Sequence, residues 1–154
     1  MLMNLLVYLA GEIHTSWREE IKEKAAKLKL PVEFVGPMQD HDYSDVIGEQ
    51  VLGAQPNNIL RDEAASKVNN LRTQILLGKS DLVIALFGEN KYRQWNTAMD
   101  ASAAITLNKP LIIIRPESLH HPLKELSEKA NVTVETVDQA LKVLSYIFET
   151  EAPK

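Results

Sequence analysis

Polar side chains gather between two apolar runs in the middle of the chain. The segment from Asp81 to Ile114 is predicted as a strand, a polar loop, a helix and a second strand. The loop and the helix start carry six candidate residues: Glu89, Asn90, Trp95, Asn96, Thr97 and Asp100. In an open parallel sheet, the loop that follows a strand opens into the ligand crevice. We therefore expect two carboxylates and an aromatic ring at a binding site.

Asp100 is the candidate nucleophile of this set. If the helix begins near Thr97, Asp100 lies in its first turn, where the helix dipole stabilises a carboxylate. An ionised carboxylate beside a sugar can attack the anomeric carbon or stabilise a developing oxocarbenium ion. The alternative is structural, because Thr97 and Asp100 also have the spacing of a capping box. Composition alone leaves both interpretations open.

Neighbouring residues could bind a substrate around that nucleophile. Glu89 could act as a general acid or hold sugar hydroxyls, or it could be a solvated loop residue. Asn96 could bind the sugar. Trp95 could stack on a nucleobase, or it could belong to the core or to an interface. Gly88 and Asn90 flank Glu89 and are included among the candidate substrate contacts.

The turn after the first apolar run supplies the other wall of the expected crevice. Tyr8 lies in that run, and Gly11 at its end allows a ligand to approach the backbone closely. The next helix starts with free N–H groups that could bind an anion, with His14 and Arg18 to reinforce them. Glu12 lies in the same turn. The chain has no Gly-x-Gly-x-x-Gly and no phosphate-loop lysine motif, so a dinucleotide or triphosphate site is not indicated.

Two histidine-containing stretches could bind a metal. Ligands as close in sequence as Asp40, His41 and Asp42 cannot all face one ion without a special loop, and a solvated acidic loop is the simpler interpretation. His120 and His121 are expected at the surface, with His121 as a possible helix cap before a proline at the first helical position. We expect no metal and no cofactor.

Alternating strand and helix patterns predict the sheet that positions these residues. Five apolar runs predict the strands: Leu5 to Ala10, Val32 to Val35, Leu82 to Phe87, Pro110 to Ile114 and Val132 to Val134. Helices between them indicate a parallel sheet covered on both sides. We expect a single-domain α/β fold over residues 1–154, a flavodoxin-like three-layer sandwich with strand order 2-1-3-4-5. The crevice then lies between the first and third strands.

Local signals predict how the helices start. Ser16 with Glu19, and Thr136 with Gln139, have the spacing of capping boxes. The segment from Met38 to Asn58 is predicted as a long irregular stretch that could close over the site.

Composition excludes several classes of protein. The chain has 154 residues, 45% hydrophobic and 25% charged, with a formal net charge of −4. That balance argues against a nucleic-acid binder, which normally carries a basic stripe. With no cysteines, disulfides, thiolate metal sites and cysteine catalysis are excluded. The apolar start is too short to span a bilayer and lacks a basic leader, so we expect a cytoplasmic protein without a membrane partner.

Three stretches carry a family resemblance: YLAG from Tyr8, DLVIAL from Asp81 and NTAMDASAAITLNKPL from Asn96. Together they resemble the nucleoside 2-deoxyribosyltransferase superfamily, and the whole chain looks most like its small YtoQ branch. The resemblance places Asp100 on the family's nucleophilic glutamate and Tyr8 on the aromatic residue that orients it. Two acids of the family pattern fall at Thr73 and Gln94.

The resemblance implies an enzyme of N-glycosidic bonds, either a 2-deoxyribosyltransferase or a hydrolase, that acts on a nucleoside or nucleotide through a carboxylate nucleophile. It also implies a homo-oligomer. The departures at Thr73, Gln94 and Asp100, where aspartate replaces glutamate, motivate an alternative: a non-catalytic module of the same fold that binds a nucleotide-like ligand.

Overall fold

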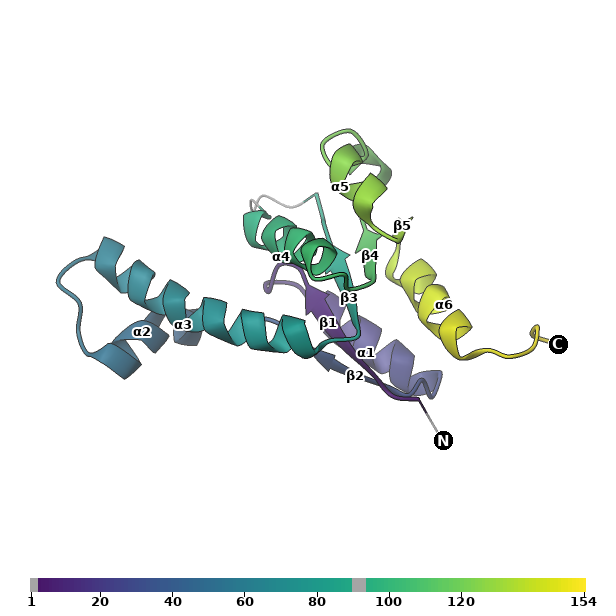
Figure 1. Ribbon diagram of the computed structural model, residues 1–154, viewed down its shortest axis with the longest axis horizontal. Helices are drawn as coiled ribbons and strands as arrows, with labels where there is room; N and C mark the ends of the chain where they lie inside the picture. Colours follow the sequence, from purple (N-terminus) through teal and green to yellow (C-terminus); the bar gives the residue numbers. More distant parts are fainter. Residues whose placement is uncertain (1–2, 90–93) are drawn as a thin grey trace.

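Strands and helices alternate along the chain (Figure 1). The computed structural model describes residues 3–89 and 94–154. Its elements are β1 (Leu5–Ala10), α1 (Trp17–Lys27), β2 (Val32–Val35), α2 (His41–Leu52), α3 (Asn58–Lys79), β3 (Leu82–Leu86), α4 (Trp95–Thr106), β4 (Leu111–Ile114), a 3₁₀ turn η1 (Glu117–Leu119), α5 (Lys124–Lys129), β5 (Val132–Val134) and α6 (Val137–Phe148).

The strands of the described residues form one parallel five-stranded sheet in the order β2-β1-β3-β4-β5. This confirms the predicted flavodoxin-like α/β fold. The register sets Ala10 of β1 opposite Ala85 of β3, so the carboxyl ends of the two strands lie side by side. The order reverses between these strands, because the chain leaves β1 toward β2 and returns to β3 on the other side. A reversal of this kind opens a crevice at the carboxyl edge of the sheet.

Helices cover both faces of the sheet, and β1 alternates between them. Val7 and Leu9 are fully buried in a cluster that includes side chains of α1 and α6. Tyr8 and Ala10 are fully buried in the opposite cluster, which includes side chains of α3 and α4. Successive strand residues point to opposite faces. Tyr8 therefore points to the face that α4 covers.

The prediction that Met38 to Asn58 is irregular was wrong, because α2 occupies most of this segment. Asp40 caps this helix and accepts a hydrogen bond from the Tyr43 N–H at 3.0 Å. The acidic residues of this segment were interpreted as those of a loop, although Asp is also a preferred N-cap residue of helices. The α2–α3 pair extends away from the sheet in Figure 1. It forms one wall of the cavity described below.

Gly48 allows α2 to pack closely on α3. A Cβ built there would lie 2.4 Å from the Ala65 nitrogen and 2.5 Å from the Ala64 carbonyl carbon, both in the α3 backbone. Backbone atoms cannot rotate away, so the Gly48→Ala variant must separate the two helices. We expect it to lose about 2 kcal/mol of stability, measured by denaturant unfolding. The control is Gly78→Ala, where an added Cβ meets nothing within 4 Å, and it should be neutral or stabilising.

The cap predictions had mixed outcomes. Thr136 and Gln139 form the predicted capping box of α6. The box predicted at Ser16 was wrong, because the Ser16 side chain makes no cap hydrogen bond. The cap predicted at His121 was also wrong, since Leu123 holds that position of α5. Thr97 does not cap α4, which begins two residues earlier and buries Thr97.

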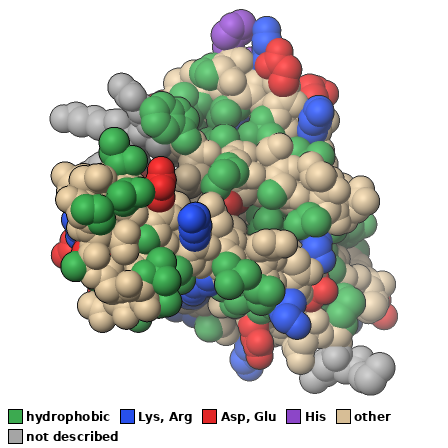
Figure 2. All heavy atoms as spheres, turned by 60° about the vertical axis from the view of Figure 1, so that its left-hand side comes forward, with side chains coloured by type: hydrophobic (Ala, Val, Ile, Leu, Met, Phe, Trp, Pro, Cys, Tyr) green, Lys and Arg blue, Asp and Glu red, His purple; other side chains and the backbone are tan. Residues whose placement is uncertain are grey.

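Many apolar side chains remain exposed on the side of the molecule that carries α2 and α3. Figure 2 brings this side forward and shows hydrophobic side chains spread among polar ones. Ile59 is 72% exposed and Leu71 61% exposed, and Trp95 and Met99 of α4 are also exposed. Within residues 3–89 and 94–154, no helix has the length and apolar character needed to cross a membrane.

Candidate active site

Tyr8 and Asp100 meet beneath the carboxyl edge of the sheet. The Tyr8 hydroxyl donates to Oδ2 of Asp100 at 3.4 Å, across 92 positions of sequence. Tyr8 comes from β1 and is fully buried, and Asp100 comes from the second turn of α4 and is 8% exposed. Among the described residues, Tyr8 is the only side chain that hydrogen-bonds to this carboxyl. The carboxyl can therefore offer its second oxygen to a ligand.

The sequence of α4 explains why Asp100 faces inward. Ala101 and Ala104 are fully buried against the sheet, and such small side chains let the helix axis approach closely. Thr97 and Asp100 are three residues apart and so lie on one side of the helix, beside that contact. Since α4 begins at Trp95, Asp100 is past the helix start and does not cap it. The capping interpretation is thus wrong.

Burial dominates the electrostatics of the pair. It raises the pKa of Asp100 from 3.8 to about 6, while the Tyr8 hydrogen bond and the positive charge of Arg18 act in the opposite direction. Burial also raises the pKa of Tyr8 well above its usual value, and the negative charge of Asp100 adds to this effect. Tyr8 therefore stays protonated and donates, and Asp100 is ionised near neutral pH.

Arg18 lies behind the turn that follows β1. Its Nη1 donates to the Glu12 carbonyl at 2.6 Å, and its Nη2 donates to the carbonyls of Leu9 at 3.1 Å and Gly11 at 2.8 Å. The side chain is 1% exposed, and burial lowers the pKa of its guanidinium. The structure thus does not bring Arg18 to the cavity as a ligand contact. It fixes the backbone of the turn and places a positive charge near Asp100.

One N–H group of the anion site suggested by the sequence, that of Thr15, is already engaged in the turn before α1. The Glu12 carboxylate accepts hydrogen bonds from the N–H groups of His14 at 2.5 Å and Thr15 at 3.2 Å. It also accepts one from the Thr15 hydroxyl. An anion would have to displace this carboxylate. For the Thr15 N–H the prediction was wrong, because a side chain from the same turn supplies the acceptor that a ligand was expected to supply.

Asp100 opens into a cavity of about 930 Å³ between the turn after β1, the start of α4 and the α2–α3 pair. Seven of the candidate residues named from the sequence line it: Gly11, Glu12, His14, Trp95, Asn96, Thr97 and Asp100. The opposite wall includes Met38, His41, Ser44 and Asp45 from the segment that was expected to close over the site, and Asp62, Asn69, Arg72 and Thr73 from α3. Sequence reasoning did not single out Asp62, Asn69 or Arg72. The N-cap signal at Asp40 could have placed α2 and the polar residues that face the cavity.

Gly88 and Glu89 lie outside this lining, at the other end of the loop. The Gly88 N–H donates to Oε1 of Gln94 at 2.8 Å, and Nε2 of Gln94 donates back to the Gly88 carbonyl at 2.7 Å. Glu89 accepts a hydrogen bond from the Ser118 hydroxyl. These contacts fix the Gln94 side chain against the Gly88 backbone and direct the Glu89 side chain to Ser118. The predicted substrate contact Asn90 lies outside the described residues.

Comparison with known proteins identifies the family. Residues 8–148 match the model of a family described as nucleoside 2-deoxyribosyltransferase YtoQ. The chain belongs to this family. This YtoQ-family chain is 70% identical over 149 residues to a protein of Bacillus subtilis (strain 168) named uncharacterized protein YtoQ. That alignment covers 97% of this chain and 100% of the Bacillus protein. The resemblance seen in the sequence is thereby confirmed.

A solved structure shares the fold of this YtoQ-family chain. It is a 2-deoxyribosyltransferase from Bacillus psychrosaccharolyticus, and the superposition has a TM-score of 0.53. The match covers 90% of this chain and 95% of the other at 14% sequence identity. At this identity the likeness establishes the fold, and the chemistry has to be argued from the residues of this chain.

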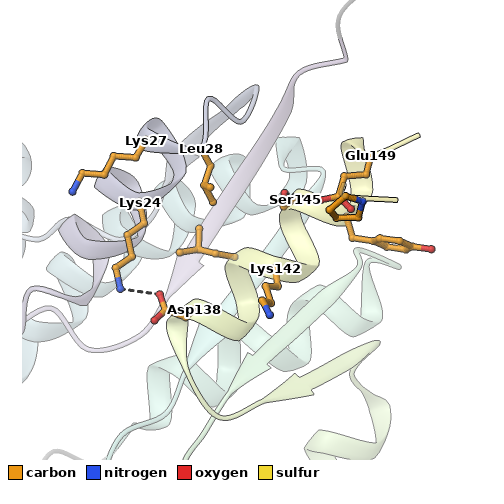
Figure 3. Close-up of a pocket in the computed structure, with 10 residues that line it drawn as sticks. Lys24, Lys27, Leu28, Asp138, Lys142, Ser145 and Glu149 are labelled. Carbon is orange, nitrogen blue, oxygen red and sulfur yellow. Dashed lines mark hydrogen bonds and ion pairs between the residues drawn. The ribbon is translucent and has the colours of Figure 1, made fainter. Parts of the chain in front are cut away.

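A second hollow of the YtoQ-family chain has a different character. It measures about 660 Å³ and lies between α1 and α6, on the face of the sheet opposite Asp100 (Figure 3). Lys24 and Asp138 form an ion pair of 2.8 Å at its edge, and Leu141 lies in its wall. It holds no buried carboxylate among the residues that line it. The cavity at Asp100 is therefore the candidate active site.

Within residues 3–89 and 94–154, the histidines and carboxylates of this chain do not form a metal centre. No group of three or more His, Cys, Asp or Glu residues with a metal-binding arrangement is present there. Asp40 caps α2, and Nε2 of His41 pairs with Oδ2 of Asp45 at 3.3 Å.

Proposed function

We propose that this protein cleaves the N-glycosidic bond of a nucleoside, with Asp100 as the nucleophile. The carboxylate attacks the anomeric carbon, and the sugar then passes to a second base or to water. The observation that carries the proposal is the buried Tyr8–Asp100 pair at the wall of the large cavity. A carboxylate that is held by one donor and shielded from bulk water is suited to nucleophilic attack.

The cavity suits a nucleoside in its volume and in the side chains that line it. Ligand cavities in proteins measure roughly 300–1,000 Å³, which includes the value found here. Trp95 is 69% exposed at the cavity, where its ring can stack on a base. Asn96 offers its amide to sugar hydroxyls, and Asn69, whose Nδ2 donates to the Ser44 carbonyl at 2.9 Å, offers its Oδ1. Each of these assignments is part of the proposal.

Charge around the cavity favours an unphosphorylated substrate. Four carboxylates line it: Glu12, Asp45, Asp62 and Asp100. The arginine of the lining, Arg72, already donates through Nη1 to the Gly36 carbonyl at 2.6 Å. A phosphate dianion would meet repulsion there. We therefore expect nucleosides to react faster than their monophosphates.

The test is a panel of deoxyribonucleosides, ribonucleosides and their monophosphates, with free base measured by chromatography. The wild-type protein should release base from at least one member, and the Asp100→Ala variant should not. A second base added to the mixture distinguishes transfer from hydrolysis, because transfer yields a new nucleoside. If wild type and Asp100→Ala release the same amount of base from every compound, the proposal is wrong.

The pKa of Asp100 predicts how activity depends on pH. Asp100 acts as a nucleophile only when ionised, and burial raises its pKa to about 6. Below that pH the rate constant kcat/KM should fall about tenfold per pH unit. Base release measured over a pH series checks this. A rate that stays level down to about pH 5 would contradict the assignment, since kcat/KM reports the free enzyme.

A non-catalytic binding module remains the second candidate. It is favoured by Thr73 and Gln94, which stand where the resembling family has acids, and by the engagement of Gln94 with the Gly88 backbone. Thermal-shift titration with nucleosides separates the two functions. Saturable binding of a compound that is recovered intact supports the module, while turnover of the bound compound rejects it.

Self-association remains a prediction as well. The exposed apolar residues of α2, α3 and α4 are compatible with a homo-oligomer, because exposed hydrophobic patches often mark interfaces. Light scattering coupled to size exclusion gives the molar mass that tests it.

A further inference from the structure

A histidine–aspartate pair faces the same cavity as Asp100. His41 is the first residue of α2, and its Nε2 lies 3.3 Å from Oδ2 of Asp45 one turn later. The ring of His14, from the turn after β1, meets the His41 ring edge-on with centroids 5.5 Å apart. All three residues line the cavity. The His41 side chain is 57% exposed and therefore accessible to a ligand.

The proposed reaction needs a proton donor that Asp100 cannot supply. When the carboxylate bonds to the anomeric carbon, the C–N bond breaks and its electron pair goes to the base nitrogen. A base that leaves as an anion is a poor leaving group, so a donor within the cavity accelerates this step. Asp100 is consumed as the nucleophile, and the Tyr8 hydroxyl is engaged in its hydrogen bond to Asp100.

Two other ionisable groups on the cavity wall are engaged in different roles. Glu12 accepts hydrogen bonds from the N–H groups of His14 and Thr15, and Arg72 donates to the Gly36 carbonyl. The charged groups that line the cavity with His41 are Asp45 on its own helix, Glu12 on the turn after β1, Asp62 and Arg72 on α3, and Asp100 on α4. Of the cavity residues, Asp45 pairs with His41 and His14 is in ring contact with it.

We propose that His41, held by Asp45, protonates the departing base. The inference rests on the proposed function, since it concerns the same reaction. Asp45 holds Nε2–H of the imidazolium, and the other ring nitrogen gives its proton to the base nitrogen that receives the electron pair. In the second step, neutral His41 takes a proton from water or from the incoming base as that nucleophile attacks the sugar. Asp100 is then released as a carboxylate, and the pair returns to its starting state.

A substrate whose base needs no proton tests the role of His41. In 7-methyl-2′-deoxyguanosine the base already carries a positive charge and leaves as a neutral molecule. In 2′-deoxyinosine the base depends on a donor. We expect His41→Gln to lower kcat for 2′-deoxyinosine about 10²-fold or more and to leave kcat for the methylated nucleoside unchanged. Asp45→Asn should show the same selectivity with a smaller loss.

The matched control is His121→Gln, which replaces a histidine that is exposed and does not line the cavity. It should leave both substrates unaffected. Equal losses on both substrates in His41→Gln, or no loss on either, would overturn the inference while the proposed function stands. If the wild-type protein releases base from neither nucleoside nor from any other member of the panel, the proposed function fails, and this inference fails with it.

Discussion

Asp100→Asn is expected to lower base release by about 10³-fold or more, because an amide cannot form the glycosyl ester that the carboxylate forms. The substitution keeps the size of the side chain, so the Tyr8 contact and the cavity stay in place. Initial rates with the best substrate of the panel give the measurement. The matched control is Asp62→Asn, which removes another cavity carboxylate. It should retain activity within about tenfold.

The same variant should be more stable than the wild type. The pKa of Asp100 is raised from 3.8 in the unfolded chain to about 6 in the fold, so the native state binds this proton more tightly. The resulting stabilisation is complete below pH 3.8 and is lost as pH rises through about 6. At neutral pH the buried charge lowers the free energy of unfolding by up to about 3 kcal/mol, since each pKa unit corresponds to ~1.4 kcal/mol.

Asp100→Asn removes that cost, so its melting temperature should exceed that of the wild type at pH 7, and the difference should shrink at acidic pH. Functional groups often carry such a stability cost. Calorimetry at several pH values measures it. An inactive variant that melts well below the wild type at pH 7 would indicate that Asp100 has a structural role.

Tyr8→Phe is expected to lower base release about 10²-fold, which is the usual effect of losing one fixed donor in a buried site. The phenyl ring keeps the packing of β1 against α4, so the fold should persist. The hydroxyl also lowers the pKa of Asp100, and its loss lets burial raise that pKa further. The acidic limb of the pH profile should therefore move to higher pH.

The profile distinguishes a positioning role from a packing role. Tyr146→Phe is the matched control, because Tyr146 is 76% exposed on α6, on the other face of the sheet. It should leave both the rate and the profile unchanged. If Tyr8→Phe loses activity with no movement of the acidic limb, the hydroxyl does not act through the Asp100 carboxyl.

The sheet could be predicted from sequence because its determinants are local and periodic. Apolar runs such as Leu5–Ala10 and Leu82–Leu86 are buried on both faces, and alternation with helices restricts the connections to few topologies. The strand order then places Tyr8 and Asp100 near one edge. The resemblance identified the two residues, and the alternation of β1 toward α4 explains why they meet.

The rest of the site depends on contacts that no local pattern encodes. The Glu12 carboxylate accepts hydrogen bonds from N–H groups in the turn before α1. Arg18 donates to three carbonyls at the end of β1 and in the turn that follows it. Both side chains were predicted as ligand contacts from their charge and position. The helical conformation of α2 was missed because its acidic residues suit a helix start as well as a loop, and Gly48 allows the close packing on α3 that fixes the helix.

The central claim is that the Asp100 carboxylate bonds to the sugar. Intact-mass spectrometry of the protein, quenched in acid during turnover without an acceptor base, tests it directly. We predict a species heavier by one sugar residue, located by peptide mapping at Asp100 and missing in Asp100→Asn. Release of base at full rate with no adduct, or with the adduct on another residue, would contradict the account.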